Sequence, residues 1–165
     1  MYIYHINKNN MNSIKKISLF VVLLMAYNVG ISQDKDEVAQ LLNRNEVAIY
    51  KAQKEIISHN SKSNIDKLAM SVTLQERAID VYKTGNLKET SNYAIASREN
   101  ALMILKELLD AKQLSYFELD NSEKNIVKAI DYNPSLLNNK VESYNEAILL
   151  DPIKMKETYN ITINQ

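Results

Sequence analysis

A chain of 165 residues suits one domain with a sizeable core and is too short for two. Its 20 basic and 20 acidic residues balance, and the part after residue 33 carries a net charge of −3, which excludes the basic stripe of a dedicated nucleic-acid-binding protein. The absence of cysteine excludes disulfides, thiol catalysis and cysteine metal sites, and two glycines are too few for a phosphate-binding loop.

The first predicted element is an export signal over residues 11–32. Lys15 and Lys16 form its positive region, residues 17–26 are apolar, and Gly30 and Ser32 are the small residues that a signal peptidase reads. The apolar run is shorter than the roughly 20 residues of a spanning helix, so an uncleaved anchor is the alternative. We therefore predict an N-terminal extension and signal over residues 1–32, and one exported domain over 33–165 without a stable membrane span.

Three long helices are predicted next, over residues 34–58, 63–83 and 86–112. Each has apolar residues at helical spacing along one face. Ser63 with Asp66 approximates a capping box for the second helix, and Asn86 with Glu89 starts the third. Short turns join the helices, and none can bury its apolar face alone, so we predict an all-α antiparallel bundle.

The C-terminal third has shorter predicted helices. One covers residues 122–130, and the pairs Asn133-Pro134 and Asp151-Pro152 each place a good N-cap before a proline. These pairs predict a helix over residues 134–150 and a last one from 152 to near 159.

Side chains that could support catalysis or hold a cofactor are few. His59 is the only histidine after the signal, and it falls in a predicted polar turn, whereas a zinc site needs three or four ligands. Haem ligation by His59 with Met70 or Met103 is imaginable, but the methionines fit equally well in a core. Carboxylate pairs such as Glu76 with Asp80 are typical of solvated helix faces. We predict no catalytic activity, no metal and no cofactor.

Two resemblances add to this picture. Residues 82–89, with Tyr93 and Ser97, resemble the turn and second helix of a tetratricopeptide unit, although prolines 18 residues apart do not match that family's period. The same stretch resembles exported helical-hairpin domains of unknown function, and the signal region resembles exported proteins of Bacteroidota. Both likenesses of the hairpin imply protein binding or structural support and carry over no catalytic residue.

The favoured hypothesis is a periplasmic or secreted module that binds another envelope protein or supports an envelope assembly. Its predicted contact surface is a groove between the second and third long helices at Tyr93, Ala94 and Arg98, because a tyrosine beside small residues suits an interface. The first alternative is a carrier of a small ligand or cofactor within a helical bundle. The second is an enzyme with two acidic groups buried together. The partner and the oligomeric state stay open.

Overall fold

The computed structural model describes residues 34–138 and 141–162, all within the unit of residues 33–165. The predicted extension, signal and cleavage position after Ser32 lie outside the described residues. Every regular element in the described ranges is a helix, as predicted. None of the helices found there is long and apolar enough to cross a membrane.

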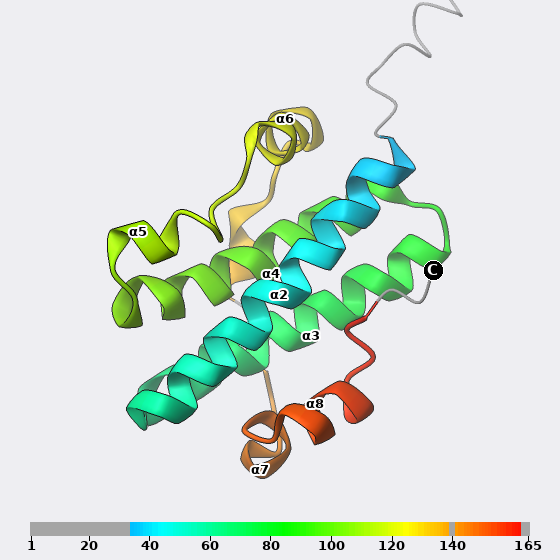
Figure 1. Cartoon of the computed structure of the whole chain (residues 1–165). Helices are drawn as coiled ribbons and strands as arrows, with labels where there is room; N and C mark the ends of the chain where they lie inside the picture. Colours follow the sequence, from blue (N-terminus) through cyan, green and yellow to red (C-terminus); the bar gives the residue numbers. More distant parts are fainter. Residues whose placement is uncertain (1–33, 139–140, 163–165) are drawn as a thin grey trace, which may run out of the picture. The chain divides into compact units, whose positions relative to one another are not determined.

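Three long helices form the antiparallel bundle that the sequence predicts: α2 (Lys35–His59), α3 (Ile65–Lys83) and α4 (Leu87–Leu108) (Figure 1). Asp34 caps α2 by accepting a hydrogen bond from the Asp36 N–H at 2.9 Å. Gly85 follows α3 with φ +82°, a left-handed conformation that glycine adopts without strain, and Asn86 then caps α4. The tight turn brings α4 back along α3.

Helix α4 packs against both α2 and α3. Small residues let it approach α3 closely: the Ser71 hydroxyl donates to the Ser97 carbonyl, and the Ser97 hydroxyl donates to the Ser71 carbonyl, each at 2.7 Å. Helix α4 carries the small residues Ala94, Ser97 and Ala101 on its inward side. All three of these residues are completely buried.

The shorter elements follow in the order α5 (Ala111–Leu114), α6 (Asn121–Ile130), η2 (Pro134–Asn138), α7 (Glu146–Leu149) and α8 (Pro152–Thr158). Helix α6 begins with the capping box of Asp120 and Glu123. The main hydrophobic core joins the three long helices with side chains of the C-terminal part, namely Leu149, Met155 and Ile161.

The predicted helix over residues 134–150 is wrong. A 3₁₀ helix ends at Asn138, residues 141–145 are not helical, and Asn145 caps a new helix by accepting from the N–H groups of Ala147 and Ile148. Leu136 and Leu137 pack in a small cluster with Met70 of α3, whereas Leu149 enters the main core. Tertiary packing in two places thus overrides the apolar period of this stretch.

Two further boundaries differ from the prediction. Helix α4 ends at Leu108, not near residue 112, because Leu109 is extended and the Asp110 side chain caps α5 instead. The Ser63 capping box does not form. The short 3₁₀ helix η1 (Lys62–Asn64) precedes α3, and the Asn64 side chain donates to the Glu107 carboxylate at 2.8 Å.

Candidate functional site

The structure places the three predicted contact residues in different environments. Tyr93 is partly exposed, and the Arg77 guanidinium lies 5.8 Å from its ring centroid. Ala94 and Arg98 are buried, with 0% and 1% of their surfaces exposed, so their side chains do not form a contact surface. That part of the prediction is corrected: residues four apart share a helix face, and the face of Ala94 points into the bundle.

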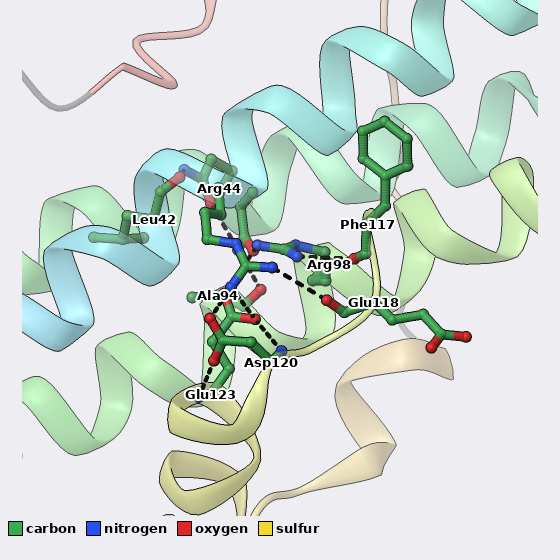
Figure 2. Close-up of polar contacts among 10 residues, drawn as sticks. Leu42, Arg44, Ala94, Arg98, Phe117, Glu118, Asp120 and Glu123 are labelled. Carbon is green, nitrogen blue, oxygen red and sulfur yellow. Dashed lines mark hydrogen bonds and ion pairs between the residues drawn. The ribbon is translucent and has the colours of Figure 1, made fainter. Parts of the chain in front are cut away.

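Arg98 instead organises a buried polar network between α2, α4 and the α5–α6 region (Figure 2). Its Nε donates to the Asn45 Oδ1 at 2.7 Å, and its Nη1 donates to the Phe117 carbonyl at 2.9 Å. Its Nη2 lies 3.2 Å from Glu123 Oε1 of α6, forming an ion pair. One guanidinium thus joins three segments that are distant in the sequence.

A second arginine completes the charge balance of this network. Arg44 of α2 pairs with Asp120, lies 3.2 Å from Glu123 Oε2 and donates to the Glu118 carbonyl at 3.3 Å. Asp120 and Glu123 also exchange the two capping-box hydrogen bonds, each 2.9 Å long. Two arginines therefore face two carboxylates, and the α6 N-terminus is held against α2 and α4 (Figure 2).

An amide relay extends the network into the bundle. Asn45 Nδ2 donates to the Ala94 carbonyl and to Gln75 Oε1, the latter at 3.2 Å. Gln75 Nε2 donates in turn to the Leu42 carbonyl at 2.8 Å. Asn45 and Gln75 are both fully buried, so these bonds satisfy groups that water does not reach.

The electrostatics of the network follow from its burial. Desolvation lowers the pKa of Arg98, and the Glu123 carboxylate opposes that shift. The Glu123 N–H and the Arg44 guanidinium hold the pKa of Asp120 below its usual range. The paired charges fix the position of α6, and this arrangement is suited to holding elements together.

A surface groove lies beside the only predicted contact residue that is partly exposed. The hollow of about 320 Å³ is open to solvent and is lined by the start of α4 and the turn before η2, with Asn86, Lys88, Glu89, Asn92, Tyr93, Asn133 and Leu136. Its two sides are joined because the Asn133 N–H donates to Asn92 Oδ1 at 3.0 Å. Just behind it, the Tyr132 hydroxyl donates to Glu99 Oε2 at 2.6 Å.

A larger hollow of about 660 Å³ lies between α2 and α8. Its lining residues are Tyr50, Pro152, Ile153, Lys156, Glu157, Asn160 and Thr162. Burial, together with the nearby Glu46 carboxylate, raises the pKa of the Tyr50 phenol.

The other side chains that could bind a cofactor, His59, Met70 and Met103, line neither of these two hollows. His59 is the last residue of α2, half-exposed, with its Nδ1 3.0 Å from the Glu55 carbonyl oxygen. Met70 is buried, and Met103 is exposed. In the described ranges, no group of three His, Asp or Glu side chains is arranged to hold a metal ion.

The carboxylates were the last candidates for catalysis, and their burial and ion-pair partners can be compared. Two of those described are buried, Glu55 and Glu123. Each is ion-paired with a base of its own: Glu55 lies near Lys51, and Glu123 lies near Arg98. The described residues therefore offer the carboxylate-enzyme hypothesis no pair of buried acids that share a site.

Comparison with known proteins adds no relative. No family model, curated protein or solved structure matches the chain.

Proposed function

We propose that this chain is an exported helical module that binds another protein, with an envelope protein as its partner. The observation that carries the proposal is the groove at Tyr93, in which a partly exposed aromatic ring lies beside Leu136 and a polar rim. Tyrosine suits a contact of this kind because it offers a large apolar area and one hydroxyl group at low entropic cost.

The groove is preorganised, which favours binding. The Asn92–Asn133 hydrogen bond joins its two sides, and the Tyr132–Glu99 hydrogen bond fixes the adjoining turn on α4. A surface whose residues are already held in place loses less conformational entropy when a partner docks. The rim carries one charge of each sign, on the exposed Lys88 and on Glu89, and these can orient a polar partner next to the apolar side chains.

Site-specific crosslinking in the native envelope tests this proposal. A photoreactive residue would replace Lys88 on the rim of the groove, or the exposed Lys124 of α6 as the matched control. We expect one protein to be captured from position 88 and not from position 124, and Tyr93→Ala to abolish that capture. Equal capture from both positions, or capture unaffected by Tyr93→Ala, would remove the groove from the proposal.

The second candidate function is a small-ligand carrier, and the 660 Å³ hollow between α2 and α8 favours it. Pro152, Ile153 and the Tyr50 ring give this hollow an apolar lining with Lys156 among its polar groups, which suits an amphipathic organic ligand. Native mass spectrometry and visible absorbance of the purified chain separate the two functions. A stoichiometric bound molecule that is lost in Ile153→Asp would favour the carrier, and a clean protein mass would disfavour it.

A further inference from the structure

The C-terminal part of the chain lies along the groove between α2 and α3. The Tyr144 hydroxyl donates to Asp66 near the start of α3, and farther along the Ile161 carbonyl accepts from Gln75 Nε2 at 3.4 Å. Against α2 the order is reversed: Gln53 contacts Leu149, and the Thr162 hydroxyl donates to Glu46 at 2.9 Å. Residues 144–162, here called the C-terminal segment, therefore run parallel to α3 and antiparallel to α2 (Figure 1).

Three aliphatic side chains anchor this segment at intervals of six residues. Leu149, Met155 and Ile161 are fully buried, and all three belong to the main hydrophobic cluster with residues of α2 and α3. Between the anchors the segment faces solvent, as shown by Ile153, which is 70% exposed. The segment thus buries one side only, as a bound peptide does in a helical groove.

Two buried glutamines contact the backbone of the segment. Gln53 Nε2 donates to the Leu149 carbonyl at 2.6 Å, and Gln75 Nε2 donates to the Ile161 carbonyl. Both glutamines are at most 1% exposed, because each lies on the core-facing side of its helix. An amide that donates to a main-chain carbonyl recognises the path of a chain, while the pockets for the anchors supply selectivity.

We infer that the groove between α2 and α3 is a peptide-binding site whose ligand is the C-terminal segment, and that a second copy of the chain can supply this ligand. The C-terminal segment of a second copy has the same sequence, so it can place the same three anchors and the same carbonyl groups in this groove. A covalent tether gives the resident segment an effective concentration on the order of millimolar, so it occupies its own groove in dilute solution. Exchange between copies becomes visible once the tether is cut.

The experiment uses the full chain with a protease recognition sequence inserted between the exposed residues Glu142 and Ser143. Two batches, one isotopically heavy, are cleaved after folding and mixed, and native mass spectrometry follows the complexes. We expect the cleaved segment to remain bound and mixed light–heavy complexes to form. Loss of the helical fold on cleavage, release of the segment without loss of fold, or complexes that never mix would each overturn the inference.

Matched peptides test which contacts determine binding. Labelled peptides covering residues 144–162 would compete for the cleaved chain, one carrying Met155→Asp at a buried anchor and one carrying Thr158→Asp at an exposed position outside the hollow between α2 and α8. We expect the first to compete at least about tenfold more weakly than the unchanged peptide, because it must bury a charge, and the second to compete normally. Equal competition by both peptides would contradict an anchored site.

A second matched pair tests backbone recognition. Gln53→Ala in the groove removes the donor to the Leu149 carbonyl, and Gln113→Ala on exposed α5 is the control. We expect about tenfold faster loss of the cleaved segment from the first variant and no change in the second. The site of the C-terminal segment is separate from the Tyr93 groove. A negative result in these exchange experiments would therefore leave the proposed function standing. A negative result in the crosslinking test of the Tyr93 groove would likewise leave this inference standing.

Discussion

Arg98 of α4 and Glu123 of α6 form an ion pair in which the Arg98 and Glu123 side chains are only 1% and 4% exposed. The contact connects the long helices to an element whose own apolar attachment is small, with Ile126 and Ile130 as its buried aliphatic residues. Removing charges from water is expensive, and their mutual attraction repays that cost only with good geometry and further hydrogen bonds. Asn45 and the Phe117 carbonyl supply those hydrogen bonds to Arg98.

Removal of one member of this pair is therefore predicted to destabilise the fold strongly. Arg98→Met leaves the buried Glu123 carboxylate with Arg44 as its remaining ion-pair partner and removes the donor to Asn45 and to the Phe117 carbonyl, so we expect a loss of up to about 3–5 kcal/mol in the free energy of unfolding. Urea denaturation followed by circular dichroism measures it. Lys83→Ala, which breaks the exposed Lys83–Asp80 pair, is the control and is expected to cost at most about 1 kcal/mol.

The double variant Arg98→Met with Glu123→Gln separates the charge from the packing. Glutamine keeps an oxygen for the capping box but carries no charge. We expect the double variant to be more stable than Arg98→Met alone. If the two are equally unstable, the loss comes from the arginine's hydrogen bonds and packing, and the explanation by the buried Glu123 charge is wrong.

A second prediction concerns the acid stability of the α6 N-terminus. Hydrogen bonding to the Glu123 N–H and pairing with Arg44 depress the folded pKa of Asp120. With an unfolded pKa of about 3.9, the carboxylate contributes stability above that pH and loses the contribution as pH falls through the folded pKa. Asp120→Asn keeps a capping oxygen without the charge, so the difference in Tm from the wild type should be largest at neutral pH.

Thermal melts of both proteins over a pH series measure this difference. The gap should close in acid, and added salt should narrow it at neutral pH, because the Asp120 side chain is 49% exposed and its charge is screened. A gap in Tm that does not vary with pH would show that the aspartate acts through its hydrogen bonds alone.

A third prediction concerns the close approach of α3 and α4. The reciprocal hydrogen bonds of Ser71 and Ser97 leave no room for a larger side chain at either position. Ser97→Leu should force the helices apart and cost at least about 1–3 kcal/mol in unfolding free energy. Ser97→Ala removes only hydrogen bonds and should cost about 1 kcal/mol. A leucine variant as stable as the alanine variant would mean that the contact is looser than described.

The long helices could be predicted because several local signals agree there. Apolar spacing, the Asn86 cap and Gly85 after the last turn all place the α3–α4 hairpin within a few residues of its observed position. The Asp120 and Glu123 capping box was readable in the same way, although the prediction began that helix at Ser122. Local capping chemistry determines such boundaries, so a single sequence is enough to find them.

The site was harder to predict because it depends on tertiary contacts. Arg98 is four residues from Ala94, which places it on the buried face, but a charged residue is normally expected in water. Its partner Glu123 comes from a separate helix, and no spacing indicates that pairing. The helix predicted over residues 134–150 failed for a related reason, since apolar period alone does not show that Leu137 and Leu149 enter different clusters.

The last prediction uses Tyr144 as a reporter of the C-terminal segment. Its hydroxyl donates to the Asp66 carboxylate, and this hydrogen bond, with a smaller effect of burial, raises the pKa of Tyr144 to about 12. Because an unfolded tyrosine titrates near pH 10, the contact contributes its full stability below about pH 10 and loses it as pH rises through the folded pKa. Alkaline spectrophotometric titration of the wild type minus Tyr144→Phe isolates this phenol. We expect this difference titration near pH 12 in the wild type and closer to pH 10 in Asp66→Asn. A wild-type value near pH 10 would show that the C-terminal segment does not contact α3 at Asp66.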